Sequence, residues 1–232
     1  MDIFEREEML IGKDAVEKLH KAKVVIFGVG GVGGYVAEIL ARGGVGTIAV
    51  VDNDSVSISN VNRQIIATHS SIGKSKVAVV CDRLFDINPR INARPFEMFY
   101  DESTADEIDL SKFDYIIDAI DTVTSKLLLI ENAKKEGVKI ISCMGTGNKL
   151  TTDFIIDDIF STSVCPLCKV MRKELKNRGI KSLKVLFSRD VPIKPDLQIT
   201  ENGRHIPGSI SFSPAAAGIK IGEYVIKELL ND

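Results

Sequence analysis

The stretch Val24-Val25-Ile26-Phe27-Gly28-Val29-Gly30-Gly31-Val32-Gly33-Gly34 decides the fold. Four apolar residues lead into a glycine cluster, and apolar residues at helical spacing follow over 36–40. This order predicts a buried parallel strand, a tight turn and a helix. Gly28, Gly30 and Gly33 form a G-x-G-x-x-G pattern, which lets backbone amides and a helix N-terminus approach a phosphate closely. We predict a nucleotide phosphate here; the alternative is a turn whose glycines serve packing alone.

The acidic residue after the second predicted strand indicates where the ribose lies. Residues 47–51 form an apolar run that ends at Asp52. In dinucleotide-binding folds an acidic residue at the tip of the second strand contacts a ribose hydroxyl. The same arrangement serves NAD, FAD, S-adenosylmethionine and ATP, so these two strands leave the nucleotide open.

Alternating strands and helices predict an α/β fold with a doubly wound, Rossmann-like, mostly parallel sheet and a less regular C-terminal extension. The predicted strands are 24–27, 47–51, 93–99, 113–117, 138–143, 152–159 and 183–188. The predicted helices are 12–21, the segment around 36–40, 73–87, 124–136, 166–178 and 214–230. Residues 189–207 are predicted to be a loop. We expect a single domain over 1–232, with a nucleotide-binding core over 1–150 and an extension over 151–232.

Length and composition limit the class of protein. The chain has 232 residues, 44% hydrophobic content and a net charge of −2, which suits one α/β domain and gives no overall basic field. No apolar run approaches membrane-spanning length, and the acidic start Met1–Glu5 is unlike a signal peptide. Four scattered cysteines form no disulfide framework. We expect a cytoplasmic protein with no membrane partner.

Three polar clusters follow predicted strands, where such a sheet binds its ligand. Within 60–64, Arg63 offers the planar fork that binds phosphate oxygens; the alternative is a solvated surface arginine. Segment 73–76 places lysines at a helix start, either for phosphate or simply exposed. Within 118–121, Asp121 is a candidate Mg²⁺ ligand, with a helix cap as its alternative. Together they favour a nucleoside triphosphate with a metal over a hydride-transfer cofactor, for which no acid or base is evident.

These motifs resemble the ThiF/MoeB/HesA superfamily of ATP-dependent adenylyltransferases, which are related to ubiquitin-activating enzymes. The resemblance covers nearly the whole chain, and segments 118–126, 171–180 and 208–214 look most like the tRNA threonylcarbamoyladenosine dehydratases. It implies that a carboxylate on a modified tRNA adenosine is converted to an acyl adenylate, pyrophosphate is released, and internal ring closure follows. The alternative within the superfamily is adenylation of the C-terminus of a ubiquitin-like sulfur-carrier protein of the thiamine or molybdopterin type.

The resemblance implies that 1–232 form a single ATP-binding adenylyltransferase domain, with 151–232 as its acceptor-side or dimer-side extension. It also implies roles for individual residues. It assigns ATP binding to Gly28, Gly30, Gly31, Gly33, Asp52, Asn60, Arg63, Gln64 and Lys76, with Asp52 on the ribose and Asn60, Arg63 and Lys76 on the phosphates. Arg63 and Lys76 are also catalytic candidates, together with Asp121, which organises Mg²⁺. Arg6 lies where family members place an arginine that reaches into the partner subunit of a homodimer.

A basic segment near the C-terminus is the candidate tRNA contact. From Cys165 to Arg189 there are eight lysines and arginines and one acidic residue, Glu174. A basic helix followed by a basic strand would track a phosphate backbone, whereas the alternative is a solvated helix face. The residues assigned to tRNA are Arg172, Lys173, Lys176 and Arg178.

The cysteines depart from the pattern of the sulfur-carrier-activating relatives. Those relatives often hold zinc with two Cys-x-x-Cys pairs, but here Cys165 and Cys168 form one pair and 169–232 contain no cysteine. We therefore expect neither a structural zinc nor a thioester on that last segment. The role of the pair stays open, as does a sulfur-relay partner.

Overall fold

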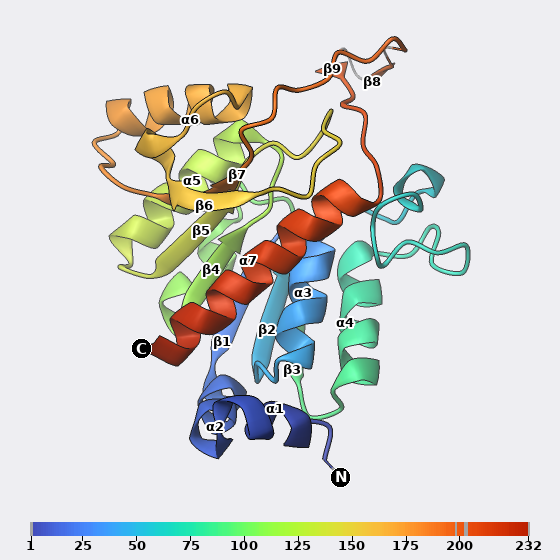
Figure 1. Ribbon diagram of the computed structural model, residues 1–232, viewed down its shortest axis with the longest axis vertical. Coiled ribbons are helices and arrows are strands. Elements are labelled where there is room, and N and C mark those ends of the chain that lie inside the picture. The colour runs from blue at the N-terminus through green and yellow to red at the C-terminus, as the bar shows by residue number, and fades with distance from the viewer. Residues whose placement is uncertain (1, 198, 202–203, 232) are drawn as a thin grey trace.

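One seven-stranded sheet organises the molecule, as Figure 1 shows. The computed structural model describes residues 2–197, 199–201 and 204–231. The strand order is β3-β2-β1-β4-β5-β7-β6, and every neighbouring pair is parallel except β7 and β6. The strands are β1 (Lys23–Phe27), β2 (Thr47–Val51), β3 (Asn92–Phe96), β4 (Tyr115–Asp118), β5 (Lys139–Cys143), β6 (Ile155–Asp158) and β7 (Lys184–Phe187). The doubly wound, mostly parallel sheet predicted from the sequence is confirmed.

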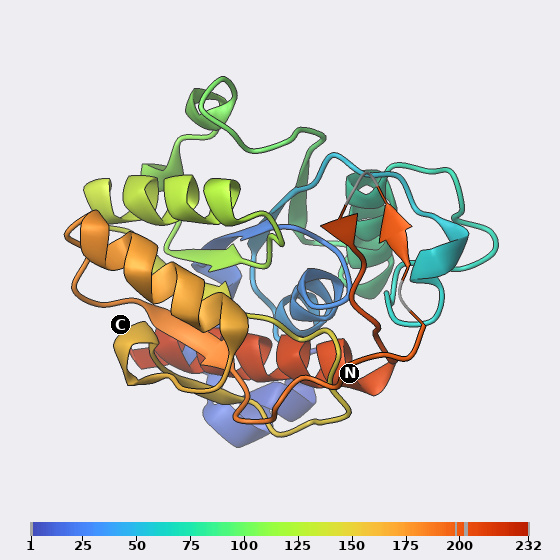
Figure 2. The ribbon, with the colours of Figure 1, turned by 90° about the horizontal axis from the view of Figure 1, so that it is seen from above.

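Helices cover both faces of this sheet, and Figure 2 shows the two helical layers on either side. The helices are α1 (Glu5–Ile11), α2 (Lys13–Lys21), α3 (Gly33–Arg42), α4 (Lys76–Ile87), α5 (Val123–Lys135), α6 (Pro166–Asn177) and α7 (Phe212–Asn231). Helices α3, α4 and α7 pack on one face, and α5 and α6 on the other. No helix in the described part of the chain has the length and apolar character that crossing a membrane requires.

The central strand β1 shows how the sequence matches a sheet that is covered on both faces. Val24 and Ile26 point into the core formed with α3 and α7, whereas Val25 and Phe27 point into the core formed with α5 and α6. All four are fully buried. A strand covered on both faces has a continuous apolar run in its sequence, as residues 24–27 do.

The C-terminal part of the chain belongs to the same sheet and core. Strand β7 pairs in parallel with β5, and β6 closes that edge in the antiparallel sense. Helix α7 lies across α3 at close range, because a Cβ on Gly218 would lie 2.5 Å from the carbonyl oxygen of Val32. A Cβ on Gly222 would likewise lie 2.6 Å from the side chain of Ile39. Both glycines are therefore required by packing.

Several element boundaries differ from those expected. Helix α1 was not predicted, and no residue within it is buried, so it shows no apolar period. Helix α4 begins at Lys76 because 73–75 turn instead, with Gly73 at φ +83° and Ser75 in an antiparallel bridge to Ser55. Strand β3 ends at Phe96 rather than at residue 99.

The segment expected to be a loop over 189–207 contains a short hairpin of β8 (Thr200–Glu201) and β9 (Arg204–His205). Residues 198 and 202–203 of that segment lie outside the described residues. Four short 3-10 turns complete the fold: η1 (Ile58–Asn60), η2 (Ala105–Glu107), η3 (Leu110–Lys112) and η4 (Ile159–Ser161).

Candidate nucleotide-binding site

The glycine turn after β1 is shaped by two close backbone approaches. Gly28 has φ +85°, and its N–H donates to the carbonyl of Val51 at 2.7 Å. A Cβ on Gly28 would lie 2.6 Å from the carbonyl oxygen of Ala119, and one on Gly33 would lie 1.9 Å from the carbonyl oxygen of Gly28. Neither position accepts a side chain, so the turn brings α3 directly behind the ends of β1 and β4.

The loop after β2 brings two predicted residues to the glycine turn. A Cβ on Gly30 would lie 3.6 Å from Nε2 of Gln64, and one on Gly31 would lie 3.7 Å from Cγ of Arg63. Oε1 of Gln64 is buried and has no hydrogen-bond partner among the described residues. A ligand or a water molecule would satisfy such a group. The glycines, Gln64 and Arg63 thus form one cradle, although their sequence positions are more than thirty residues apart.

Arg63 is held in place by its own loop. Its Nη1 donates to the carbonyl of Ser59 at 2.7 Å and to Oδ1 of Asn62 at 3.0 Å. Partial burial lowers the pKa of the Arg63 guanidinium from its ordinary value, which still leaves it charged at neutral pH. The buried Asn60 accepts the N–H of Ser57 through Oδ1 at 3.0 Å, so its amide oxygen shapes the loop that presents Arg63.

Asp52 stands at the tip of β2 beside the turn. Its Oδ2 accepts the N–H of Val29 at 2.8 Å, and its Oδ1 accepts the N–H of Asp54 at 2.9 Å. These two bonds fix the carboxylate between the glycine turn and the following loop. Each oxygen keeps a further lone pair for a hydroxyl group.

Lys76 is the first residue of α4 and is only 5% exposed. Its Nζ bonds Oδ2 of Asp54 at 2.6 Å and lies 3.9 Å from Oδ1 of Asp52. The sequence alone did not indicate the pairing with Asp54. That pairing keeps the ammonium charge beside Asp52.

A second charged pair lies at the end of β4 and is completely buried. Nζ of Lys126 donates to Oδ1 of Asp118 at 3.0 Å and to the carbonyl of Ile120 at 2.9 Å. Oδ1 of Asp118 also accepts the N–H of Ile120 at 3.1 Å, and its Oδ2 accepts the hydroxyl of Ser142 at 2.5 Å. The roles of Lys126 and Ser142 were not foreseen from the sequence.

Asp121 projects at this edge with its carboxylate exposed. Its Oδ1 accepts the hydroxyl of Thr122 at 3.3 Å. Thr122 is the N-cap of α5, and no side-chain hydrogen bond caps that helix, so the alternative assignment of Asp121 as a cap is wrong. An exposed carboxylate with free lone pairs is the donor that Mg²⁺ prefers.

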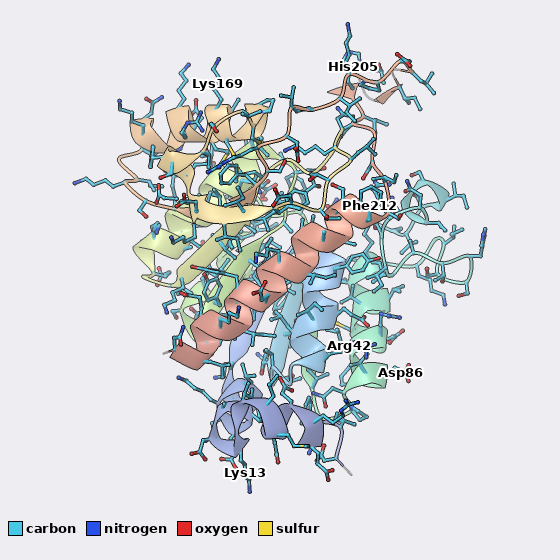
Figure 3. The ribbon with its side chains drawn as sticks, in the orientation of Figure 1. Lys13, Arg42, Asp86, Lys169, His205 and Phe212 are labelled. Atoms are coloured by element: carbon cyan, nitrogen blue, oxygen red, sulfur yellow. The ribbon has the colours of Figure 1, made fainter. Side chains whose placement is uncertain are left out.

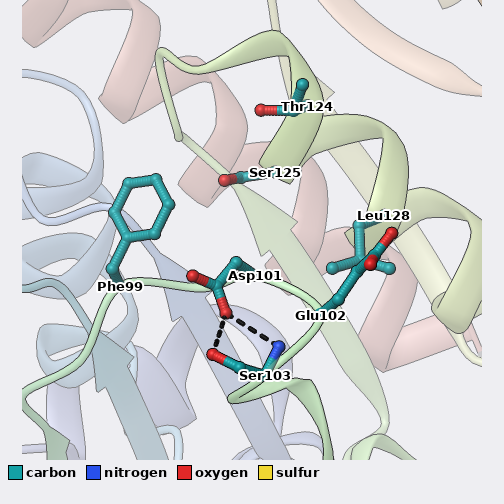
Figure 4. A pocket seen from close by; sticks show the side chains of 7 residues that line it. All are labelled: Phe99, Asp101, Glu102, Ser103, Thr124, Ser125 and Leu128. Atoms are coloured by element: carbon teal, nitrogen blue, oxygen red, sulfur yellow. Dashed lines mark hydrogen bonds between the residues drawn. The ribbon is translucent and has the colours of Figure 1, made fainter.

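An open pocket of about 410 Å³ lies between the segment 99–103 and the first turns of α5, as Figure 4 shows. Phe99, Thr124 and Ser125 contribute to its wall, together with Asp101, Glu102, Ser103 and Leu128. Asp101 accepts the N–H and the hydroxyl of Ser103, and these bonds lower the pKa of its carboxyl. The pocket combines an exposed aromatic ring with hydroxyl groups, the lining expected for a flat polar ring.

Comparison with known proteins agrees with this geometry. Residues 4–230 match the ThiF family. The chain belongs to the ThiF family. It is 40% identical over 241 residues to the tRNA threonylcarbamoyladenosine dehydratase of Bacillus subtilis, covering 99% of this chain and 95% of that protein. The enzyme of the same name from Escherichia coli is 32% identical over 169 residues, which cover 72% of this chain and 63% of that protein.

Solved structures place this ThiF-family chain in the same group. The AMP complex of the E. coli tRNA N6-threonylcarbamoyladenosine dehydratase TcdA has a TM-score of 0.88 and 27% identity, covering 97% of this chain and 92% of that one. The ATP complex of the same enzyme has a TM-score of 0.87 and 26% identity, covering 98% and 93%.

Two predicted groups lie away from the glycine turn. Arg6 is exposed on α1, which packs beside α2 at the amino-terminal edge of the sheet, so it cannot reach the turn of its own subunit. The basic segment lies on and beyond α6; Figure 3 shows Lys169 at the opposite end of the molecule from Lys13. Lys169 thus lies at the opposite end of the molecule from α1 and α2, and Arg6 lies on α1.

The basic residues of α6 are not equivalent. Arg172 bonds the carbonyl and the hydroxyl of Thr162, and Arg178 pairs with Glu174 at 2.7 Å and Glu131 at 3.4 Å. Lys173 and Lys176 are exposed and make no ion pair within the described residues. The two lysines are therefore free to bind an anion, whereas both arginines are already engaged.

The Cys165–Cys168 pair begins α6 and is buried. The hydrogen bond from Cys168, helped by the N–H groups of Cys168 and Gly145 and the nearby charge of Lys149, lowers the pKa of the Cys165 thiol to about 5. The hydrogen bond that the Cys168 thiol donates to Cys165, together with burial, raises the pKa of the Cys168 thiol above its ordinary value. No group of three or more histidine, cysteine, aspartate or glutamate side chains that could hold a metal ion occurs among the described residues.

Proposed function

We propose that this protein is an ATP-dependent tRNA threonylcarbamoyladenosine dehydratase that activates the carboxylate of the modified adenosine as an acyl adenylate. The carboxylate oxygen bonds the α-phosphorus of ATP and pyrophosphate leaves; internal ring closure then releases AMP. The observation that carries the proposal is the convergence of Arg63, Gln64 and the Asp52–Lys76 pair on one glycine turn. The full-length similarity to the B. subtilis dehydratase supports the choice of acceptor.

The residues of the cradle suit an adenylation reaction. Negative charge grows on the α-phosphate and on the departing pyrophosphate, and positive groups held in position beforehand stabilise it. Arg63 beside Gly31 and Lys76 beside Asp52 supply two such charges, and the N-terminus of α3 supplies a third. Asp52 would hold the ribose, and the pocket beside Phe99 has the lining for the adenine ring.

Asp121 fits the role of a Mg²⁺ ligand, because its carboxylate is exposed at the same edge and is not a helix cap. A bound Mg²⁺ would neutralise charge on the pyrophosphate group. The protein's own contribution would be to present the Asp121 carboxylate at the edge of the sheet that carries the glycine turn.

A second candidate function is adenylation of a sulfur-carrier C-terminus. The sulfur carrier protein adenylyltransferase of Thermus thermophilus is 32% identical, but over only 61% of this chain and 52% of that protein. The exposed lysines Lys173 and Lys176 on α6 favour a polyanionic acceptor. A sulfur-relay partner remains a prediction tied to this second candidate.

We also propose a cytoplasmic homodimer in which Arg6 completes the neighbouring site. Arg6 is exposed on α1 and far from the turn of its own subunit, which supports action across an interface. Mixing Arg6→Ala with Asp121→Ala subunits should restore activity in mixed dimers, because each dimer then has one intact site. Absence of recovery in verified mixed dimers would remove Arg6 from the reaction.

The deciding experiment is ring closure on bulk tRNA carrying threonylcarbamoyladenosine, measured by nucleoside mass spectrometry. With ATP and Mg²⁺ the wild-type protein should convert the nucleoside to its dehydrated form and release pyrophosphate. The Asp121→Ala variant should bind ATP but lose turnover almost completely, because a metal on pyrophosphate matters most in the transition state. Adenylation of a sulfur-carrier C-terminus with no reaction on tRNA would establish the second candidate instead.

A further inference from the structure

The buried Asp118–Lys126–Ser142 cluster lies outside the residues proposed to bind ATP, at the end of β4, in the first turn of α5 and near the end of β5. Asp118 and Lys126 have 0% exposure, and Ser142 is also fully buried. Replacing a buried ion pair by apolar residues of similar volume is often neutral or stabilising. Stability alone therefore gives a weak reason for such a cluster at the end of β4.

The cluster holds the backbone that leads to Asp121. Asp118 accepts the N–H of Ile120, and Lys126 donates to the carbonyl of the same residue. Both backbone polar groups of Ile120, the residue before Asp121, are thus bound to one buried ion pair. Lys126 lies in the first turn of α5 and bonds Asp118 at the end of β4. The loop between these two elements is therefore linked across its two ends.

The same loop touches the glycine turn. The N–H of Ala119 donates to the carbonyl of Phe27 at 2.8 Å, and the carbonyl of Ala119 is the atom that a Cβ on Gly28 would strike. A shift of this loop would therefore alter the distance between the Asp121 carboxylate and the phosphate cradle. A misplacement of about 1 Å can lower a rate about a hundredfold.

We propose that Lys126 is a positioning residue, which acts through Asp118 and the backbone of Ile120 to aim the Asp121 carboxylate at the nucleotide phosphates. This inference rests on the proposed function for Asp121, and it assigns to Lys126 no contact with substrate. Ser142 completes the cluster from β5 by donating to Oδ2 of Asp118.

The main test variant is Asp118→Asn combined with Lys126→Met, which removes both charges together and keeps similar side-chain volumes. Calorimetry should give an ATP affinity without Mg²⁺ within about twofold of wild type, because the cradle around Arg63 is untouched. The gain in ATP affinity on adding Mg²⁺ should fall by at least threefold, and kcat should fall at least tenfold, which is more than KM for ATP rises. Lys134→Met on the last turn of α5 is the matched control and should change neither quantity.

A double-mutant cycle separates positioning from a general structural role. In an Asp121→Ala background the Asp118→Asn/Lys126→Met change should lower turnover by less than about twofold further, because the carboxylate it positions is gone. Multiplicative losses, or an unchanged Mg²⁺ effect on ATP binding, would overturn the proposal.

A milder variant covers the case in which the double replacement fails to fold. Ser142→Ala keeps the ion pair and removes one hydrogen bond, so the same loss of the Mg²⁺ effect should occur at smaller size. An unchanged Mg²⁺ effect in this variant would also overturn the positioning role. If wild-type protein binds ATP and Mg²⁺ but does not act on tRNA, the proposed function fails, whereas the Mg²⁺ binding measurements still decide the role of Lys126.

Discussion

Two aspartate–lysine pairs flank the glycine turn, and they differ in how much water reaches them. Lys76 bonds Asp54, whose side chain is 59% exposed, whereas Lys126 bonds Asp118 with both side chains at 0%. The first pair joins a loop to the start of α4; the second joins the end of β4 to the first turn of α5. The same two residue types therefore form a pair that opens to solvent and a pair that is sealed.

The difference in burial determines what each lysine can do. An exposed carboxylate is solvated when its partner leaves, so Lys76 can exchange Asp54 for a phosphate at small cost. Lys126 has no such freedom, because leaving Asp118 would strand a charge in the core. We infer that the Lys76–Asp54 pair can open so that Lys76 binds a phosphate of the ligand. The Lys126–Asp118 pair stays closed and acts as a fixed support.

The largest expected effect concerns stability. Lys126→Met should lower the free energy of unfolding by about 3–5 kcal/mol, because it leaves the Asp118 carboxylate buried and unpaired. Lys76→Met should lower it by less than about 1 kcal/mol, since Asp54 remains in water. Urea unfolding followed by circular dichroism measures both. Equal losses in the two variants would contradict the distinction between a sealed and an open pair.

The second expected effect concerns turnover, and here the change at Lys76 should cost more than the change at Lys126. Lys76→Met should lower turnover on tRNA about a hundredfold while the protein stays folded, because it removes one charge from the phosphates. Arg63→Ala should act similarly for the same reason. Steady-state kinetics measure the loss of turnover, and the melting temperature shows whether the variant stays folded. A variant that loses turnover only by unfolding would assign Lys76 or Arg63 a structural role.

How far the sequence predicted this site follows the same division. The glycine turn, Asp52 and Arg63 lie in short contiguous motifs at strand ends, so spacing alone brought them to one edge of the sheet. The two lysine pairs join residues 22 and 8 positions apart, and Ser142 lies 24 positions from Asp118. No local pattern encodes such contacts, because they depend on which side chains the finished fold buries.

The elements of the fold divide in a similar way. Strands covered on both faces have continuous apolar runs in the sequence, and the ends of β1 were predicted to within one residue. Helix α1 has no buried residue, and β8 and β9 have two residues each, so neither carries a periodic signal. Arg172 and Arg178 looked like free cations in the sequence, but their partners come from Thr162 and from Glu131 on neighbouring elements.

A third, smaller effect tests the basic surface. Lys173→Glu with Lys176→Glu should weaken tRNA binding roughly tenfold and reduce its dependence on salt, because both lysines are exposed and unpaired. Charge reversal at Arg172 should act mainly on stability, since its guanidinium bonds Thr162. Filter binding over a range of salt concentrations measures the slope. An unchanged slope in the lysine variant would identify α6 as a solvated face.

The smallest effect probes the open pair directly. Asp54→Asn removes the counter-charge of Lys76 but keeps a hydrogen-bond acceptor at the same place, so the fold should hold. Because ATP no longer has to displace a carboxylate from Nζ, its affinity should rise about twofold to threefold. The gain should shrink as salt rises, since Asp54 is largely exposed and its attraction is screened. Calorimetric titration with ATP at two salt concentrations measures both quantities. If Asp54→Asn instead weakens ATP binding at low salt, Asp54 holds Lys76 in its binding position, and the open pair would then be a support like the sealed one.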